Sequence, residues 1–394
     1  MIIDYKWKNI YLSDVLYEHG ERNSKNLEIY SVSVHKGLVN QIEHLGRSYA
    51  AKDTSNYKLV KPYDIVYTKS PTGDFPYGIV KQSKVNKEVA VSPLYGVFTP
   101  KNKYLGALID NYFEFSENAN RYLKPIIQKG AKNTINISND TFLSQSIPLP
   151  MDESEQRTIA TFIETVNIYI AKKKEMLEYW KLLKESIFKK NRYGKSELKY
   201  GNSFEAVLLS DVLYEHGERN SKNLEIYSVS VHKGLVNQIE HLGRSYAAKD
   251  TSNYKLVKPY DIVYTKSPTG DFPYGIVKQS KVNKEVAVSP LYGVFTPKNK
   301  YLGALIDNYF EFSENANRYL KPIIQKGAKN TINISNDTFL SQSIPLPMDE
   351  YEQKKWYELI ELFNNCIDLI ERDIDASLEL KKAICFRFLY KGGA

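Results

Sequence analysis

Two segments of the chain carry apolar side chains at a heptad-like spacing, mostly of three, four or seven residues. In the first segment they are Ile159, Ile163, Val166, Ile170, Leu177, Trp180 and Ile187, and in the second Trp356, Ile360, Phe363, Ile367, Ile370, Ile374, Leu378 and Ile384. This spacing places them along one face of an α-helix. The pattern therefore predicts two long helices, and a helix of about 38 residues spans ~55 Å at ~1.5 Å per residue, which suits a spacer.

The residues before each long helix follow a different pattern, with short runs of β-branched and aromatic side chains. In the first half these runs predict strands at residues 26–34, 63–69, 77–81 and 89–98. Residues 103–128 carry apolar side chains at helical spacing, and residues 140–143 suit a short helix. The sequence Ile147-Pro148-Leu149-Pro150 predicts an extended exit, because proline lacks an amide donor and restricts the residue before it. The segment is thus an α+β module.

An internal repeat organises the chain. Residues Leu12–Glu153 recur without one substitution as Leu209–Glu350, a span of 142 residues shifted by 197. Structural constraint does not explain this identity, because folds tolerate many substitutions in the core and on the surface. The identity reflects a recent duplication or recombination, or a chain assembled by design. Whatever one module binds, the chain binds twice.

The repeat divides the chain into four predicted parts. They are a first domain (1–153), a central spacer helix (154–200), a second domain (201–350) and a C-terminal spacer helix (351–394). Under the shift of 197, Val166 aligns with Phe363 and Ile170 with Ile367, so the two helices share a register. We therefore expect them to pack on each other. The alternative is that each helix packs only on its own module.

Composition narrows the class of protein. The chain has 394 residues, of which 42% are hydrophobic and 25% are charged, and its net charge is +8. These values exclude a disordered or collagen-like protein, and the mild positive charge permits a polyanion partner without requiring one. The two cysteines, Cys366 and Cys385, cannot provide a disulfide framework or a cysteine-based zinc site. The sequence shows no signal peptide and no apolar run of membrane length, so we expect a soluble, cytoplasmic protein.

Sequence motifs of catalysis are missing. The chain has neither the Gly-x-Gly-x-x-Gly fingerprint of dinucleotide binding nor a nucleotide phosphate loop. It also lacks the Asn/Asp-Pro-Pro-aromatic motif of amino-methyltransferases. Its six histidines all lie in the repeats and form no His-x-x-x-His pair for a metal. We therefore expect a non-catalytic protein with no metal and no cofactor of its own.

Polar loops in each module offer side chains suited to DNA recognition, at residues 33–37, 47–49, 69–73 and 129–134 of the first copy. Hydrogen bonds from Lys, Arg, Asn, Ser, Thr and Gln read base edges, while Lys, Arg and backbone amides hold phosphates. The predicted DNA-binding residues are Ser33, His35, Lys36, Arg47, Lys69, Thr72, Lys132 and Asn133, with their copies Ser230, His232, Lys233, Arg244, Lys266, Thr269, Lys329 and Asn330. The alternative for any single one of them is a solvated polar turn.

Several motifs resemble the specificity subunit of type I restriction-modification systems. They are an aromatic residue before Leu-Ser-Asp (Trp7 and 12–14), Pro-Tyr-Asp-Ile-Val-Tyr (62–67) and Gly-Ala-Lys-Asn-Thr-Ile-Asn-Ile-Ser (130–138). The most specific is Ile-Pro-Leu-Pro followed by Glu-Gln and a long helix, at 147–150 with 155–156 and again at 344–347 with 352–353. The resemblance covers almost the whole chain, twice.

The resemblance implies an architecture and a set of partners. It implies two globular target recognition domains joined by two long helices, which pack antiparallel as a coiled-coil spacer with pseudo-twofold symmetry. Each domain would read one half of a split DNA target in the major groove. The helices would dock two methyltransferase subunits, which supply S-adenosylmethionine chemistry on adenine and are joined by restriction subunits. The outer faces of the helices, including lysines 172–174, are the candidate docking surface.

One departure from the family pattern changes the expected DNA target. Members of this family usually carry two different recognition domains, whereas the two modules here are identical. Two identical readers related by a twofold axis meet the same half-site on opposite strands. We therefore predict an interrupted inverted repeat as the target. Two alternatives stay open, namely a tandem module for a protein or carbohydrate ligand and an enzyme with an unrecognised site.

Overall fold

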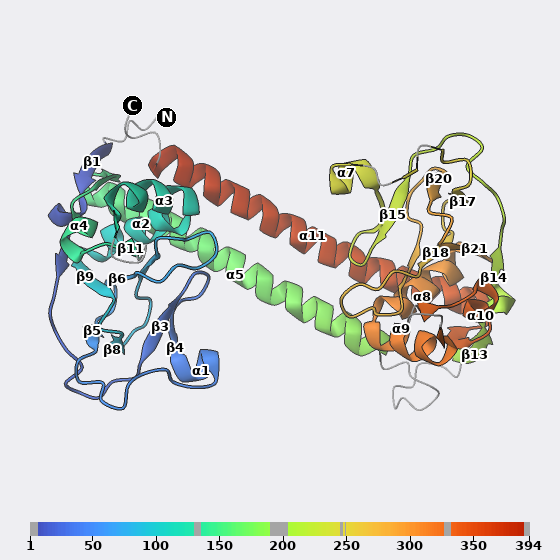
Figure 1. Cartoon of the computed structure of the whole chain (residues 1–394), viewed down its shortest axis with the longest axis horizontal. Coiled ribbons are helices and arrows are strands. Elements are labelled where there is room, and N and C mark those ends of the chain that lie inside the picture. The colour runs from blue at the N-terminus through green and yellow to red at the C-terminus, as the bar shows by residue number, and fades with distance from the viewer. Residues whose placement is uncertain are drawn as a thin grey trace. The chain divides into compact units, whose positions relative to one another are not determined.

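The computed structural model describes residues 7–129, 135–189, 204–244, 247–248, 250–326 and 332–389. Its contacts divide the chain into two compact units, the first made of Met1–Lys173 with Asp373–Ala394 and the second of Lys174–Arg372. Each unit holds one copy of the repeated domain and parts of two long helices, α5 (Glu153–Lys189) and α11 (Glu350–Leu389) (Figure 1). Within the described ranges, no helix is both long enough and apolar enough to span a membrane.

The elements of the first domain recur in the second, and the predicted α+β class is confirmed. The first domain has strands β1 (Trp7–Tyr11), β2 (Leu16–Glu18), β3 (Tyr30–Ser33), β4 (Gly37–Asn40), β5 (Lys58–Val60), β6 (Ile65–Thr68), β7 (Ile79–Gln82), β8 (Val89–Val91), β9 (Gly96–Pro100), β10 (Gln128–Lys129), β11 (Ile135–Asn136) and β12 (Ser146–Pro150), and helices α1 (Gln41–Leu45), α2 (Lys103–Glu114), α3 (Ser116–Leu123) and α4 (Asn139–Leu143). The second has strands β13 (Phe204–Leu208), β14 (Leu213–Glu215), β15 (Tyr227–Ser230), β16 (Gly234–Asn237), β17 (Lys255–Val257), β18 (Ile262–Thr265), β19 (Ile276–Gln279), β20 (Val286–Val288), β21 (Gly293–Pro297), β22 (Gln325–Lys326), β23 (Ile332–Asn333) and β24 (Ser343–Pro347), and helices α6 (Leu209–Val212), α7 (Gln238–Leu242), α8 (Lys300–Glu311), α9 (Ser313–Leu320) and α10 (Asn336–Leu340).

An antiparallel four-stranded sheet lies at the centre of each domain, in the order β2-β9-β6-β7 in the first and β14-β21-β18-β19 in the second. β6 is buried along its whole length, which suits its β-branched and aromatic residues. α2 packs along β7, and β1 pairs antiparallel with β12. The strand that opens the domain therefore meets the proline-rich strand that leaves it. The extended exit predicted at residues 147–150 is confirmed.

Two predicted strands differ from the structure. Residues 26–34 form a strand only at Tyr30–Ser33, because Asn26 has a φ of 51° and the Leu27 amide donates to Asn23 Oδ1 at 2.7 Å, which turns the chain. Residues 89–98 form two strands, separated by a turn in which the Tyr95 amide donates to the Ser92 carbonyl. The sequence patterns also missed the short strands β1, β2, β4 and β5 and the helix α1.

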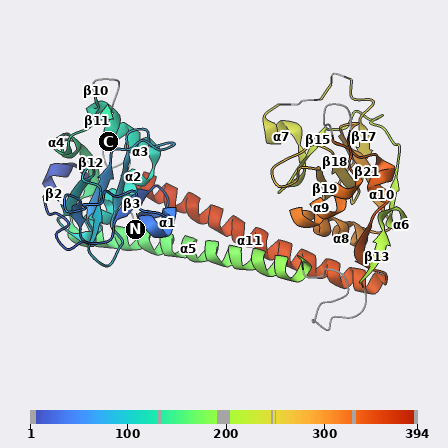
Figure 2. The same ribbon diagram turned by 60° about the horizontal axis from the view of Figure 1, so that its bottom comes forward.

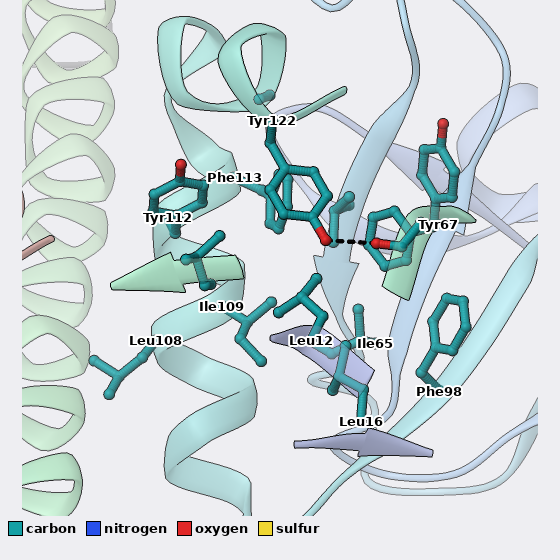
Figure 3. Close-up of a cluster of buried hydrophobic side chains, with 14 of the residues drawn as sticks. Leu12, Leu16, Ile65, Tyr67, Phe98, Leu108, Ile109, Tyr112, Phe113 and Tyr122 are labelled. Atoms are coloured by element: carbon teal, nitrogen blue, oxygen red, sulfur yellow. Dashed lines mark hydrogen bonds between the residues drawn. The ribbon is translucent and has the colours of Figure 1, made fainter. Parts of the chain in front are cut away.

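An aromatic cluster fills the core of the first domain (Figure 3). The Phe142 ring stacks on Tyr67 and Phe98, with ring centroids 4.6 and 5.2 Å apart. The Tyr122 hydroxyl donates hydrogen bonds to the carbonyls of Phe142 and Gln145. Burial raises the pKa of the Tyr67 and Tyr122 hydroxyls, so both stay neutral and bonded to carbonyls. Part of the high tyrosine content, 31 residues, thus serves the core.

In the second unit the two long helices pack against each other (Figures 1 and 2). Trp180 of α5 contacts Phe363 of α11 with centroids 5.5 Å apart, and Phe188 contacts Trp356 at 5.9 Å. The residue number rises along α5 while it falls along α11. The helices therefore run antiparallel, and the aromatic rings between them form the seam that the heptad-like spacing predicted.

The first unit repeats this arrangement with the opposite ends of the same helices. Ile159 and Ile163 near the start of α5 share one buried cluster with Cys385 near the end of α11. Farther along the pair, Lys173 forms an ion pair with Asp373 at 2.7 Å. The predicted long helices and their packing on each other are therefore confirmed. The alternative, in which each helix packs only on its own module, is wrong.

A lysine occupies the helix seam in each unit and is almost fully buried. Lys184 of α5 is 5% exposed, and its ammonium lies 2.6 and 2.7 Å from the carboxylate oxygens of Glu311 in α8 and 2.8 Å from Asn364 Oδ1. Lys381 of α11 is buried as well and pairs with Glu114 of α2 at 2.7 Å. The shift of 197 relates the two pairs. Each helix is thus joined to the domain of the other repeat by the same interaction.

The seam differs from the predicted pattern at Leu378. This residue is exposed, because the strict alternation of three and four residues continues from Ile374 through Ser377 to Lys381. A lysine at a seam position favours one register, since a shifted register would leave the buried ammonium without its partner. The polar residue that interrupts the apolar pattern therefore fixes the alignment of the two helices.

Removal of the carboxylate should cost more than removal of the lysine. In Glu311→Gln the ammonium of Lys184 stays buried without its counter-charge, and we expect a loss of about 3 kcal/mol in the free energy of unfolding. In Lys184→Met the glutamate, whose side chain is 40% exposed, regains water, and a methionine of similar volume fills the seam at little cost. Thermal and urea unfolding beside the wild type measure the difference. Equal losses would contradict the dominant role of lysine burial.

Candidate nucleic-acid interface

The β3–β4 hairpin carries three of the predicted DNA-binding residues. The two strands pair with Ser33 opposite Gly37, and Gly37 has a φ of 68°, a conformation that glycine adopts without strain. The Lys36 amide donates to the Ser33 hydroxyl at 3.3 Å, which closes the tip. His35 and Lys36 are exposed at this tip, so their side chains are accessible to a ligand.

The loop after α1 presents an arginine and a tyrosine together. α1 ends at Gly46, whose φ is 70°. Gln41 ties the loop to the hairpin, because its Nε2 donates to the Ser31 hydroxyl at 2.8 Å and its Oε1 accepts from the Tyr49 amide at 3.0 Å. The guanidinium of Arg47 lies 4.6 Å from the centroid of the exposed Tyr49 ring. The stacked pair offers hydrogen-bond donors and an aromatic face to a base or a phosphate.

Lys69 and Thr72 lie in the connection between β6 and β7. Thr72 exchanges backbone hydrogen bonds with Phe75 across a turn at Gly73 and is exposed. Lys69 is half-buried, and burial followed by the nearby ammonium of Lys58 lowers its pKa. A bound anion would relieve this repulsion, because it stabilises the charged form of the lysine. The environment of Lys69 therefore suits a phosphate contact.

These loops come from neighbouring elements of the domain. The β3–β4 hairpin packs against β7, the strand that follows the connection with Lys69 and Thr72. Gln41 joins the hairpin to the loop that carries Arg47, so four of the predicted residues share the segment 30–50. The predicted residues Lys132, Asn133, Lys329 and Asn330 lie outside the described residues.

The second domain presents its copies in the same way. Its hairpin β15–β16 pairs in the same register as β3–β4, the loop after α7 follows a helix with the same cap, and the turn after β18 has the same backbone hydrogen bonds. The copies placed there are Ser230, His232, Lys233, Arg244, Lys266 and Thr269. The two domains therefore offer the same side chains on the same local structures.

Ion pairs neutralise lysines elsewhere in the domain but not in the segment 30–50. The paired lysines of the first domain are Lys25 with Glu88, Lys58 with Glu18, Lys61 with Glu21, Lys81 and Lys84 with Asp110, and Lys87 with Glu28. In contrast, Lys36 and Arg47 form no ion pair with any residue that the structure describes. Residues 30–50 hold two basic and one acidic side chain, whereas residues 12–153 hold 17 and 15. This short segment thus carries half of the net positive charge of the whole domain.

Sequence reasoning missed Gln41 and the helix that it opens. The side chain of Asn40 caps α1 by accepting from the amides of Ile42 and Glu43. An asparagine followed three residues later by a glutamate is a helix-start signal. That signal was present in the sequence, but the helix it opens is only five residues long and carries no apolar periodicity.

Loss of the Gln41 side chain should loosen the Arg47 loop without unfolding the domain. In Gln41→Leu the Tyr49 amide loses its acceptor, and a hydrogen bond contributes about 1 kcal/mol. We expect the Tyr49 amide to exchange with solvent up to about tenfold faster, since 1.4 kcal/mol corresponds to a factor of ten. Hydrogen exchange followed by mass spectrometry or NMR measures this rate. Unchanged exchange at Tyr49 would show that Gln41 does not anchor the loop.

Two copies of an α+β domain, each with polar loops and each packed on two antiparallel helices, define a tandem-domain protein built on a pair of long helices. A family model described as the type I restriction modification DNA specificity domain matches residues 6–179 and 218–380. These two matches cover most of the chain. The chain therefore belongs to this family.

The chain is similar to solved structures, of which the first supports the fold. The type I restriction-modification S subunit from M. genitalium is 11% identical with a TM-score of 0.56, and the similarity covers 99% of this chain and 97% of that one. A structure from work on complex assembly and conformational transition of the type I R-M system is 12% identical, with 98% of each chain covered and a TM-score of 0.49. The HsdS subunit from Thermoanaerobacter tengcongensis is 14% identical, with 98% and 97% covered and a TM-score of 0.43. A search of curated protein sequences found no match.

Proposed function

We propose that the chain is the DNA sequence-specificity subunit of a type I restriction-modification complex and that each domain reads one half of a split target. The observation that carries the proposal is the pair of identical exposed loop sets, each within a domain that matches the specificity family. The likeness to the S subunit from M. genitalium supports the fold on which the proposal rests.

In this proposal the segment 30–50 and the β6–β7 connection face the DNA. Arg47 and His35 approach base edges, where hydrogen-bond donors and acceptors distinguish the base pairs. Lys36 and Lys69 hold phosphates, which fix the position of the domain on the duplex. The remaining predicted residues, Ser33, Thr72, Lys132 and Asn133, complete the set, and the second domain uses its own copies.

The chain performs no catalysis of its own in this proposal. Two methyltransferase subunits dock on the long helices and supply S-adenosylmethionine chemistry on adenine, and restriction subunits join them. Of the lysines 172–174, Lys173 is engaged with Asp373 of α11, so it stabilises the helix pair rather than a docked partner. Family membership and the exposed apolar side chains of α5, such as Ile168 and Tyr179, support a protein partner on these helices.

The identity of the domains sets the symmetry of the methylated target. Identical readers recognise identical half-sites, so we expect an interrupted inverted repeat with the same sequence on both strands. Mapping of methylated adenines, in cells that carry this chain with its methyltransferase, determines the target. Two unlike half-sites would contradict this part of the proposal. Replacement of one domain by a different one is the control and should give an asymmetric target.

Lys69 and Lys266 should contribute to DNA affinity through phosphate contacts. In the double variant Lys69→Ala/Lys266→Ala, affinity should fall on all sequences alike, and the slope of log affinity against log salt should fall by about 1 for each lysine. Titration of duplex DNA with the assembled methyltransferase at several salt concentrations measures both quantities.

The matched control for this pair is Lys25→Ala/Lys222→Ala. These lysines are exposed but already paired with Glu88 and Glu285, so we expect the salt slope to stay unchanged. An equal fall of the salt slope in both double variants would exclude a specific role for Lys69. A wild-type affinity that does not depend on salt would instead favour a module for a protein or carbohydrate ligand.

A further inference from the structure

Tyr63 and Tyr260 hold a backbone conformation that tyrosine rarely adopts. Both have a φ of 71°, in the left-handed region where a Cβ atom clashes with the backbone. Tyr63 is the third residue of a tight turn, in which the Asp64 amide donates to the Lys61 carbonyl at 3.2 Å and Pro62 comes second. Glycine is the residue that such a turn favours at this position. The turn itself therefore does not require tyrosine.

Burial of the ring does not explain the tyrosine either. Tyr63 is 49% exposed and Tyr260 is 48% exposed, so a large part of each ring faces solvent. The ammonium of Lys103 lies 5.8 Å from the centroid of the Tyr63 ring and 5.2 Å from that of Tyr104. Strained residues that the fold does not need are found at functional sites. Because of the repeat, the chain carries this strained tyrosine twice.

The strained turn is fixed next to the start of a long helix. Gln82 Nε2 donates to the carbonyls of Tyr63 and Lys103 at 3.3 and 3.0 Å. Asn102, the residue before Lys103, donates to Gln156 of α5 at 3.0 Å. This chain of hydrogen bonds places the Tyr63 backbone beside the junction between domain and helix. We call Tyr63, Lys103 and Tyr104 the junction patch of the first unit.

In the second unit the junction patch includes a residue of the helix itself. Lys300 lies 5.3 Å from the ring centroid of Tyr301 and 5.9 Å from that of Tyr357, a residue of α11, and these two rings are 5.3 Å apart. The residue that corresponds to Tyr357 in the first unit is Ala160. With Tyr260, these residues form the junction patch of the second unit.

The junction patch lies at the opposite end of the central sheet from the predicted DNA-binding loop. Tyr63 precedes β6 and Lys69 follows it. Six residues of extended chain at about 3.3 Å each separate the two by about 20 Å. Lys103 is exposed and forms no ion pair with a described residue, so the patch also carries a positive charge. It is thus a second surface of the domain, distinct from the loops and adjacent to the helices.

We propose that the junction patches are docking surfaces for the methyltransferase subunits, with Tyr63 and Tyr260 as their anchors. The proposal rests on the proposed function and adds the residues of the chain that make the contact. The matching surface of the partner is an apolar pocket for a tyrosine ring with a carboxylate facing Lys103 or Lys300. Tyrosine is enriched among residues that dominate protein interfaces. A protein fits better than DNA, because the patch adjoins the helices and lies at the far end of β6 from the loops.

The test compares two double variants that relieve backbone strain in the same domain. Tyr63→Gly/Tyr260→Gly removes the anchors, and Asn26→Gly/Asn223→Gly is the control at exposed positions with φ of 51° and 50°. We expect neither to lower the melting temperature. The tyrosine variant should bind the cognate methyltransferase subunit at least tenfold more weakly than the wild-type chain does, while the control variant binds it as wild type does. Binding of duplex target DNA by the chain alone should be the same in all three proteins.

Single variants test the two junction patches separately, because native mass spectrometry counts the bound methyltransferase subunits. Tyr63→Gly should leave one methyltransferase subunit on the chain at concentrations where wild type binds two. Tyr260→Gly should have the smaller effect, because the second unit keeps Tyr357. Lys103→Ala/Lys300→Ala alters exposed side chains without touching the turn and should weaken binding severalfold.

The possible outcomes separate this proposal from the one on which it rests. If wild type binds the methyltransferase and the tyrosine variant binds equally well, the junction patch is not the docking surface and the proposed function stands. If the tyrosine variant melts at a lower temperature, or loses DNA binding instead, the tyrosine serves the fold or the DNA interface and the proposal is overturned. If wild type binds no methyltransferase, both proposals fail together.

Discussion

The buried lysine of each long helix is the interaction on which the packing of each unit depends. Lys184 and Lys381 lie in the helix seam and reach Glu311 and Glu114 of the domain from the other repeat. A buried ammonium without its carboxylate costs several kcal/mol, so this pairing favours one register and one direction of the helices. Each domain is therefore fixed to two helices rather than to the one that follows it in sequence, and each unit combines residues from both halves of the chain.

The repeat separates what the two units share from what differs between them. The domains are identical, so every difference arises from residues outside the repeat. Phe188 and Trp356 of the second unit correspond to Cys385 and Ile159 of the first. The smaller pair is buried in the first core, whereas the aromatic pair is only partly buried against the second core and lines an open pocket. The same domain surface thus accepts two different helix surfaces, which is possible because the lysine pairs, and not a detailed fit of apolar side chains, define the alignment.

The long helices, the proline-rich exit and the repeat were predictable because each produces a regular pattern over many residues. The lysine pairs were not predictable from the sequence. A lysine at position 184 only interrupts the apolar heptad pattern, and its partner Glu311 is known only from the structure. The loops that carry Lys36 and Arg47 could be predicted as candidate DNA-binding loops from their polar and basic residues. Yet Lys25 is an exposed loop lysine like Lys36, and only its ion pair with Glu88 shows that its charge is already neutralised. The strain at Tyr63 is likewise a property of its backbone angle, which no side-chain pattern records.

The charge distribution bears on how tightly such a chain can hold DNA. Each domain has only a small excess of basic residues, and ion pairs neutralise several of its lysines, so attraction to any DNA sequence is weak and a few exposed groups must provide the contacts. Under the proposed function, one domain alone would therefore bind poorly. Two domains that each read a half-site would change this, because binding of the first half-site would make binding of the second intramolecular and raise its effective concentration. That gain would exist only for targets whose half-sites both domains can reach at once. In the proposal, the distance between half-sites thus becomes part of the recognised sequence.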